Sequence, residues 1–278
     1  MQDKVVVITG ANSGIGKETA RGLAQKGARV VMVCRNPEKG ARAAEEIRKD
    51  APGGVDLVVG DLGTLGSTRD LAKILIDSYP KIDVLVNNAG VYRLRRTPTA
   101  DGFEETFAVN HLAPFLLTNL LLDTVRASAP SRIVVVASDA HRGMRMEFDD
   151  LQSEQRYKAQ TAYGRSKMAN IMFTYALARR LEGTGVTVNA LHPGFVASNF
   201  GSGNKVPVKP VMMILGLFVL SPKQGAETPI YLASSPDVDG VSGKYFYKSR
   251  PKESTEPTYD VAAQERLWMI SEQLTGLA

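Results

Sequence analysis

The sequence predicts a three-layer, doubly wound α/β fold, in which helices cover both faces of a mainly parallel sheet. Short runs of apolar, β-branched residues alternate with helical patterns along residues 5–191. Such runs suit strands that are buried on both faces, and their alternation with helices is typical of parallel sheets. A glycine-rich turn follows the first run, where a helix is expected to begin.

The expected elements follow one another in a regular order. Strands are predicted at residues 5–9, 29–33, 55–59, 84–87, 132–137 and 187–191. The first helix is expected to end at Lys26, and later helices are expected at 37–50, 67–79, 103–125 and 162–181. Ligands of such sheets bind beyond the carboxyl ends of the strands, and the polar motifs of this chain follow those ends.

The turn after the first strand has the composition of a dinucleotide-binding loop. Gly10 allows a tight turn, Gly14 allows the backbone to approach a pyrophosphate, and Gly16 allows the helix to pack closely on the strand. The phosphates would then meet free N–H groups and the positive end of the helix dipole. The residues expected to bind them are Gly10, Asn12, Ser13, Gly14, Ile15 and Gly16.

The end of the second strand indicates which dinucleotide is bound. NAD enzymes usually place Asp or Glu there, where the carboxylate binds the ribose 2′-hydroxyl. Here the strand ends in Cys34-Arg35-Asn36, and the guanidinium of Arg35 suits a 2′-phosphate instead. We therefore predict NADP(H) as the cofactor; the alternative is that Arg35 is an ordinary solvated residue. Cys34 is expected to pack near the adenosine pocket.

Residues after three further strands are expected to complete the cofactor site. Asp61 can accept from the adenine amino group, with Leu62 against the ring. The Pro193-Gly194 turn is expected to bring backbone groups and a hydroxyl to the nicotinamide carboxamide, although an ordinary turn is the alternative. The full set is Asp61, Leu62, Asn87, Ala89, Gly90, Pro193, Gly194, Val196 and Ser198.

A tyrosine and a lysine one helical turn apart predict acid–base chemistry. Tyr163 and Lys167 have i, i+4 spacing, which places them on one face of a helix. A free tyrosine titrates near ~10, and a positive charge beside it lowers its pKa toward working pH. Tyr163 is therefore a candidate general acid/base for an alcohol/carbonyl pair, although the same spacing also occurs in surface helices.

Two polar residues strengthen this interpretation. Ser138 follows the fifth strand, at the same sheet edge, and its hydroxyl can hold a substrate oxygen. Asn110 lies inside the long helix predicted at 103–125, where asparagine is locally unfavourable and a polar task is expected. The histidines His111, His141 and His192 lack metal-ligand spacing, so we predict structural or surface roles for them and no metal.

Together these residues resemble the short-chain dehydrogenase/reductase family. The resemblance implies one Rossmann-type domain over residues 1–278, with a tetrad of Asn110, Ser138, Tyr163 and Lys167. It implies that Tyr163 exchanges the proton, that Lys167 lowers its pKa and binds the nicotinamide ribose, and that Ser138 orients the substrate. Asn110 would fix a water in the proton relay. The spacing of 25 positions from Ser138 to Tyr163 is similar to that of the retinol dehydrogenase group, since many other members have a shorter spacer.

The substrate side is expected to be apolar. Residues 206–220 lie in the region that covers the substrate in this family, and we expect a lid at about 199–221 over a lipophilic alcohol, aldehyde or ketone. A core helix or a subunit contact is the alternative. A basic rim near this lid would favour peripheral contact with an anionic membrane, unless it is scattered solvated charge. Its residues are Arg93, Arg95, Arg96, Arg142, Arg145, Lys205 and Lys209.

Composition narrows the choice of binding partner and cellular location. The net charge of +5 is modest and is not clustered with aromatic residues, so a nucleic-acid partner is not expected. The lone Cys34 cannot close an intrachain disulfide, and the start of the chain leaves no room for a signal peptide or anchor, which predicts a cytoplasmic protein. The alternatives are an NAD(H)-dependent alcohol or steroid dehydrogenase and a non-catalytic dinucleotide-binding regulator. A homodimer or homotetramer is expected from the family.

Overall fold

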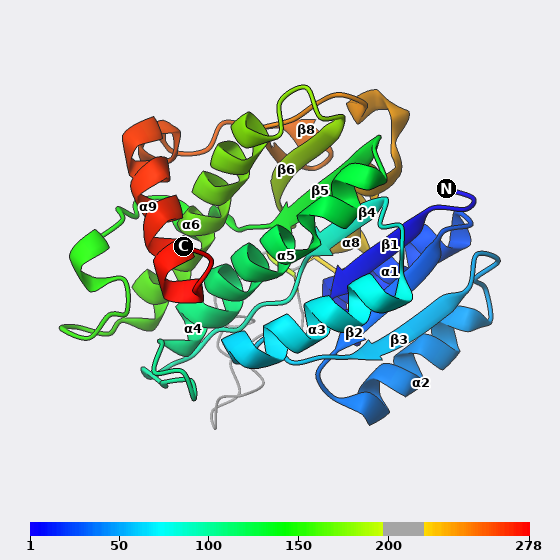
Figure 1. The fold of residues 1–278 in the computed structure, drawn as a ribbon, viewed down its shortest axis with the longest axis horizontal. Coiled ribbons are helices and arrows are strands. Elements are labelled where there is room, and N and C mark those ends of the chain that lie inside the picture. Colours follow the sequence, from blue (N-terminus) through cyan, green and yellow to red (C-terminus); the bar gives the residue numbers. More distant parts are fainter. Residues whose placement is uncertain (197–219) are drawn as a thin grey trace.

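A computed structural model describes residues 1–196 and 220–278 (Figure 1). Its eight-stranded sheet has the order β3-β2-β1-β4-β5-β6-β7-β8, and neighbouring strands are parallel except for the antiparallel pair β7 and β8. The strands are β1 (Val5–Thr9), β2 (Arg29–Cys34), β3 (Val55–Val59), β4 (Val84–Asn87), β5 (Ser131–Val136), β6 (Val186–His192), β7 (Lys244–Tyr247) and β8 (Arg250–Pro251). This arrangement confirms the predicted doubly wound, mainly parallel sheet.

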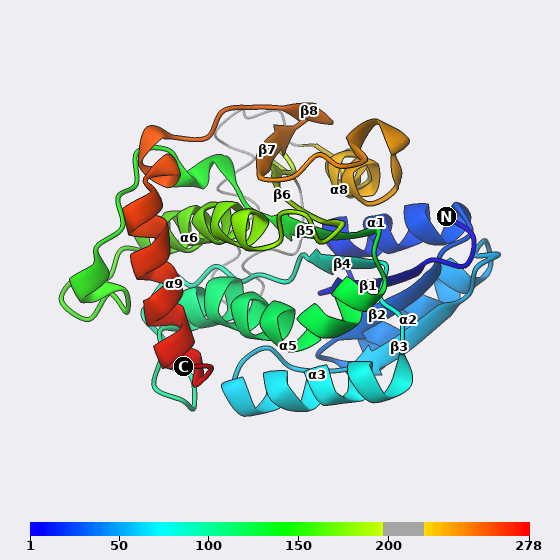
Figure 2. The ribbon, with the colours of Figure 1, turned by 45° about the horizontal axis from the view of Figure 1, so that its top comes forward.

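Helices cover both faces of the sheet (Figure 2). Buried side chains of α1, α2 and α8 pack on one face, and those of α3, α5 and α6 pack on the other, with α9 outside the second layer. The helices are α1 (Gly14–Gln25), α2 (Pro37–Arg48), α3 (Leu65–Ser78), α4 (Glu105–Phe107), α5 (Ala113–Ala127), α6 (Ala159–Arg180), α8 (Pro222–Ser234) and α9 (Val261–Thr275).

Local side-chain chemistry explains where several helices begin. The side chains of Asn36 and Thr64 accept hydrogen bonds from first-turn N–H groups of α2 and α3. Ser221 and Gln224 form a reciprocal capping box at α8, and Asp260 caps α9. These caps satisfy N–H groups that the helices themselves leave without acceptors.

The prediction of one regular helix at about 103–125 is wrong in two respects. It begins at Glu105, because the side chain of Glu104 caps the first turn by accepting from Thr106 and Phe107. It is also divided by a π-helical turn at Ala108–Leu112, which contains Asn110, before α5 begins. A π turn widens the helix locally and is frequent at functional sites. The polar residue therefore marks a change of helix geometry rather than a position within a regular helix.

The face formed by α5 and α6 is covered by the C-terminal helix. The single tryptophan, Trp268 of α9, lies with its ring centre 4.9 Å from that of Phe115 in α5 and 5.8 Å from that of Phe173 in α6. The Arg180 guanidinium lies 3.9 Å from the Trp268 ring centre. The homo-oligomer expected from the family stays a prediction.

The proposed lid at about 199–221 lies almost entirely outside the described residues, as do Ser198, Lys205 and Lys209. The described part of the chain contains no helix that is both long enough and apolar enough to cross a membrane.

Replacing Trp268 with alanine should lower the free energy of unfolding by about 3 kcal/mol, because a buried aromatic side chain is lost and a cavity remains. Urea denaturation would measure this change. The matched control is Met269→Ala, since Met269 is the exposed neighbour on the same helix and should alter the free energy by no more than about 0.5 kcal/mol. Equal effects of the two substitutions would contradict the assigned packing.

Candidate active site

The glycine-rich turn between β1 and α1 is packed against the end of β4. Gly10 has a φ of +67°, and a Cβ on it would lie 2.9 Å from the Cα of Ala89. A Cβ on Gly16 would lie 2.4 Å from the carbonyl oxygen of Gly10. Asn88 closes the contact, because its Nδ2 donates to the carbonyl oxygen of Thr9 at 2.8 Å. The turn has no room for side chains at these glycines, which suits a loop that a phosphate approaches through backbone groups.

The amino end of α1 is directed toward the same edge of the sheet. Ser13 occupies the N-cap position, yet its hydroxyl makes no capping hydrogen bond. Ile15 and Val196 lie near one another, since a Cβ on Gly225 of α8 would be 3.2 Å from Ile15 and 2.6 Å from Val196. The predicted cofactor residues after β1 and after β6 are therefore brought together. Available N–H groups at this helix end suit an anionic pyrophosphate.

The residues predicted to hold the adenosine half lie after β2 and β3. Arg35 is exposed, and among residues 1–196 and 220–278 no carboxylate pairs with it. Asp61 is exposed and accepts from the N–H of Gly63 at 3.0 Å. Leu62 is only 8% exposed and packs in the core, and Cys34 is buried, as expected of a packing residue. The unpaired guanidinium of Arg35 fits an anionic ligand group.

The two asparagines after β4 have different surroundings. The Nδ2 of Asn87 donates inward to Oγ1 of Thr118 at 2.8 Å, and its Oδ1 is buried with no partner among the described residues. Asn88 instead ties the glycine-rich turn to β4, a contact that no sequence motif indicated. The predicted side-chain contribution of Asn87 is thus directed into the core, while the backbone at Ala89 and Gly90 lines the turn.

Ser138, Tyr163 and Lys167 meet at the carboxyl edge of β5. The hydroxyl of Ser138 is hydrogen-bonded to Tyr163, and Nζ of Lys167 lies 5.8 Å from the centre of the Tyr163 ring. The same Nζ donates to the carbonyl oxygen of Val136 at 2.9 Å. The structure therefore brings together a phenol, a hydroxyl and an ammonium that the sequence separates by as many as 29 positions.

The pKa of Tyr163 is shifted in the direction opposite to the one expected from Lys167. Burial raises the pKa of Tyr163 to about 12, while its hydrogen bond with Ser138 acts in the opposite direction. Burial also lowers the pKa of Lys167 to about 8. Desolvation is the largest cause of both shifts, because Lys167 is buried and Tyr163 is partly buried. At neutral pH the phenol is therefore protonated and can donate its proton.

Asn110 connects this group to the loop after β4. Its Oδ1 accepts from the N–H of Val91 at 2.7 Å, and its Nδ2 donates to the carbonyl oxygen of Val91 and to Oγ of Ser166, each at 3.0 Å. A Cβ on Gly90 would lie 3.2 Å from Oδ1 of Asn110 and 3.5 Å from Nζ of Lys167. Asn110 and Lys167 therefore both lie close to Gly90, and Lys167 also lies beside the hydrogen-bonded pair of Tyr163 and Ser138.

The basic residues of the predicted rim are partly paired. Arg93 forms an ion pair with Glu105 in which each side chain is 15% exposed, and Arg96 pairs with Glu154. Arg142 lies 3.4 Å from Asp139. These partners reduce the positive charge that the rim can offer to a membrane, so membrane contact stays a prediction.

The histidines are all buried and make local contacts. His111 has Ser271 as a partner at 2.9 Å, while His141 and His192 contact the turn that carries Ser138. Burial lowers the pKa of His111 to about 3 and that of His192 to about 4. Within residues 1–196 and 220–278, no group of three or more His, Cys, Asp or Glu residues has metal-binding geometry.

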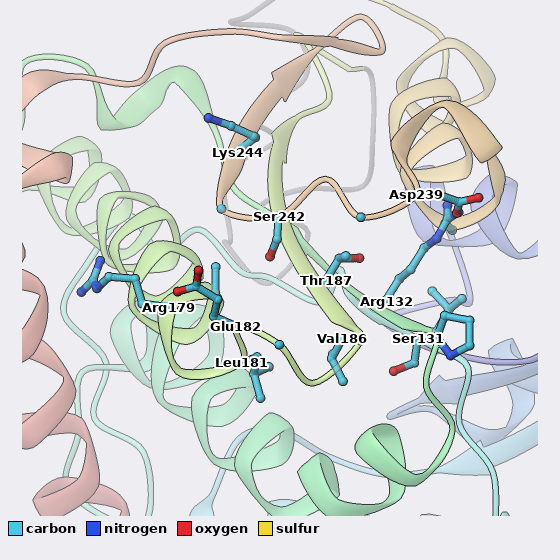
Figure 3. Close-up of a pocket in the computed structure, with 18 of the residues that line it drawn as sticks. Ser131, Arg132, Arg179, Leu181, Glu182, Val186, Thr187, Asp239, Ser242 and Lys244 are labelled. Carbon is cyan, nitrogen blue, oxygen red and sulfur yellow. The ribbon is translucent and has the colours of Figure 1, made fainter.

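A cavity of about 1050 Å³ lies at the opposite edge of the sheet (Figure 3). The amino ends of β5, β6 and β7 and the end of α6 contribute to its lining. Its arginines already have acceptors: Arg132 donates to the carbonyl oxygens of Leu232 and Ser235, and Arg179 donates to Glu265. Ligands of parallel sheets bind at the carboxyl ends instead, so the candidate site is the tetrad edge and not this cavity.

Comparison with known proteins agrees with this geometry. The sequence profile described as short chain dehydrogenase matches residues 4–205. This chain belongs to the short-chain dehydrogenase/reductase family. It is 47% identical to mouse retinol dehydrogenase 14, over 100% of this chain and 87% of that protein, and 43% identical to human retinol dehydrogenase 13, over 99% of this chain and 85% of that protein.

Solved structures give the same assignment. A Mycobacterium paratuberculosis protein superposes with a TM-score of 0.80 at 35% identity, covering 99% of this chain and 94% of that one. A Pseudomonas aeruginosa RhlG/NADP active-site complex has a TM-score of 0.70 at 25% identity, covering 88% and 94%. The protein is therefore a retinol dehydrogenase-like oxidoreductase with a Rossmann-type fold, of a family that binds nicotinamide dinucleotides and acts on CH–OH and C=O groups.

Carbonyl reduction by this enzyme should slow as the pH rises through about 8. If Tyr163 is the proton donor, the cationic form of Lys167 is expected to stabilise the phenolate that remains. Because burial lowers the pKa of Lys167 to about 8, this charge is present below that pH and is lost above it. Measuring kcat from about pH 6.5 to about 9.5 tests this expectation.

The matched variant is Lys167→Arg, whose guanidinium does not titrate in this range. Its residual rate should lack the decline near pH 8. A decline of the same size in the variant would show that another group is responsible.

Proposed function

We propose that this protein is an NADPH-dependent reductase of lipophilic aldehydes or ketones, with alcohol oxidation as the reverse reaction, and that residues 1–278 act as a single catalytic domain. The contact that carries the proposal is the hydrogen bond between Ser138 and Tyr163 beside the buried Lys167. This group lies at the same sheet edge as the glycine-rich turn, so a reacting carbonyl and a bound dinucleotide would meet there.

Each member of the tetrad has a distinct task in this proposal. When bound, the nicotinamide ring supplies the hydride in reduction or accepts it in oxidation. Tyr163 donates its phenolic proton to the carbonyl oxygen, and Ser138 donates a hydrogen bond that orients the same oxygen. Lys167 stabilises the resulting phenolate and binds the ribose. Asn110 holds the Val91 backbone beside them, and we assign it the water of the proton relay.

The remaining predicted residues are assigned to the cofactor. Those after β1 bind the pyrophosphate, those after β3 and β4 bind the adenosine half and line the turn, and those after β6 hold the carboxamide. Ser198, which also belongs to the last group, lies outside the described residues. Two observations support this assignment. Side chains added at Gly10 and Gly16 would collide with backbone atoms, and the Ser13 side chain makes no capping hydrogen bond at the start of α1.

The preference for NADPH follows from Arg35. It is an exposed guanidinium at the end of β2, beside the turn whose Gly10 N–H donates to the carbonyl oxygen of Val33 at 2.9 Å. No acidic residue stands at this strand end to bind a ribose 2′-hydroxyl. A guanidinium forms charge-assisted hydrogen bonds with phosphate, each contributing about 1.5–3 kcal/mol.

Replacing Arg35 with alanine should therefore reduce the ratio of kcat/KM with NADPH to kcat/KM with NADH by at least about tenfold. The control is Arg42→Ala on the exposed side of α2, which should leave the ratio unchanged. Steady-state rates with the two cofactors provide the measurement. A wild-type preference for NADH would refute the assignment and favour an NAD(H)-dependent alcohol or steroid dehydrogenase.

The lipophilic substrate class is supported by the relatives and by one aromatic contact. The retinol dehydrogenases that match over the whole chain are named for a long apolar alcohol. In this chain the half-buried Tyr92 lies edge-on to Tyr163, with ring centres 5.5 Å apart, and so offers an apolar wall beside the acid.

A series of aldehydes of increasing chain length should show kcat/KM rising with apolar length, as NADPH consumption would reveal. Tyr163→Phe should reduce turnover at least about 100-fold, because general acid catalysis is lost, while NADPH binding persists. Tyr231→Phe in α8 is the control and should retain full turnover. Full activity of Tyr163→Phe would exclude the tyrosine as the acid, and binding of NADPH without turnover of any carbonyl would favour a non-catalytic regulator.

A further inference from the structure

The turn that carries Ser138 is hydrogen-bonded to residues 245–255, which lie 106 to 114 positions further along the chain than their partners. The phenol of Tyr245 donates to Oδ1 of Asp139 at 2.9 Å, and Nζ of Lys252 donates to Oδ2 at 2.6 Å. His141 and Arg142 make two further contacts with the same segment. The N–H of Thr255 donates to Nε2 of His141 at 3.3 Å, and Nη2 of Arg142 donates to the carbonyl oxygen of Glu253 at 2.9 Å.

His141 connects this segment directly to the serine backbone. Its Nδ1 lies 2.6 Å from the carbonyl oxygen of Ser138, which can only accept, so Nδ1 carries the proton. Its Nε2 is then free to accept from the N–H of Thr255. The ring is fully buried and lies edge-on to Tyr245, with centres 5.3 Å apart. Both ring nitrogens of His141 are thus hydrogen-bonded in a single ring orientation. The imidazole therefore links the carbonyl group of Ser138 to the backbone N–H of Thr255.

Asp139 is the charged centre of the same arrangement. Burial would raise its pKa, but the hydrogen bonds from Lys252 and Tyr245 and the nearby charges hold the pKa at about 2. Its backbone N–H donates to Nδ1 of His192 at 3.3 Å, and His192 stacks on Tyr247 with ring centres 5.2 Å apart. The carboxylate is therefore ionised. It bonds to Tyr245 of β7 and to Lys252 after β8, and Nε2 of His192 in β6 lies 3.9 Å from Oδ2.

We propose that Tyr245, Lys252, Glu253 and Thr255 form a C-terminal clamp, and that it acts through the positioning residues Asp139 and His141 to aim the Ser138 hydroxyl. This inference rests on the proposed function, because the serine that it orients belongs to the proposed reduction site. The clamp makes the rate depend on a segment that bonds to Asp139 and His141, more than 100 positions away in the chain.

The physical reason lies in the shortness of the turn. Ser138 has extended backbone (φ −162°) and is followed by one 3₁₀ turn at Asp139–His141, which has few hydrogen bonds of its own. The Ser138 hydroxyl already accepts from the N–H of Ala140 at 3.2 Å, so rotation of the turn would move it away from Tyr163. A displacement of about 1 Å in an active site can reduce a rate by up to about 100-fold.

The test compares two lysines of one hairpin. Nζ of Lys252 and Nζ of Lys248 lie 4.8 Å and 5.4 Å from the centre of the same Tyr247 ring, but Lys252 alone of the two bonds to Asp139. Lys252→Met should lower kcat for aldehyde reduction about tenfold, with the KM and dissociation constant for NADPH unchanged. Lys248→Met should leave kcat unchanged. Tyr245→Phe, which removes the other hydrogen bond to Asp139, should behave like Lys252→Met.

A second background separates positioning from general loss of structure. In Ser138→Ala the hydroxyl to be aimed is absent, so adding Lys252→Met should cause no further loss of kcat. An additional tenfold loss in that background would overturn the proposal. So would full kcat in both Lys252→Met and Tyr245→Phe.

Amide hydrogen exchange tests the clamp independently of turnover. Exchange in residues 138–142 should be faster in Lys252→Met than in wild type, and unchanged in Lys248→Met. Unchanged exchange in Lys252→Met would refute the clamp even if the protein reduces no carbonyl. Faster exchange in a protein that reduces none of the aldehydes would instead refute the proposed function and leave the clamp as a property of the fold.

Discussion

The hydrogen bond from Nζ of Lys167 to the carbonyl oxygen of Val136 joins α6 to the end of β5, and the chemistry at this edge depends on it. The bond fixes a buried ammonium where its charge has no water to stabilise it, so the lysine pKa is low. It also ties α6, which carries Tyr163, to the strand that precedes Ser138. The phenol, the hydroxyl and the ammonium are consequently arranged by the packing of one helix on one strand.

The same edge illustrates how burial changes the roles of groups. An exposed tyrosine–lysine pair would favour the phenolate, but here desolvation raises the pKa of Tyr163 and keeps its proton in place. That state suits proton donation to a carbonyl oxygen. The ionised Asp139 lies one residue from Ser138, but its carboxylate is directed to Lys252 and Tyr245. Of these two neighbours, Ser138 carries the hydroxyl proposed to orient the substrate, and Asp139 carries a charge that stabilises the structure.

Most of the site could be anticipated because each of its motifs is local. The glycine-rich turn, Ser138 at a strand end and the Tyr163–Lys167 spacing are all encoded within a few consecutive residues, and parallel strands bring their carboxyl ends to one edge. The contacts that hold these motifs were not anticipated. Asn88 bonding to Thr9, and Tyr245 and Lys252 bonding to Asp139, join positions 79 to 113 residues apart, and no periodicity signals them.

Sequence alone determined the order of strands and helices in residues 5–191, the family and the candidate reactive groups, because these follow from hydrophobic periodicity and from short motifs. The tertiary structure decided the local geometry, the hydrogen-bond partners and the pKa shift of each group. It replaced a regular helix at Asn110 with a π turn, directed the Asn87 amide into the core, and reversed the expected pKa shift of Tyr163. Buried surroundings and hydrogen bonds between distant positions accompany all three differences, and both depend on which distant segments pack together rather than on neighbours in the chain.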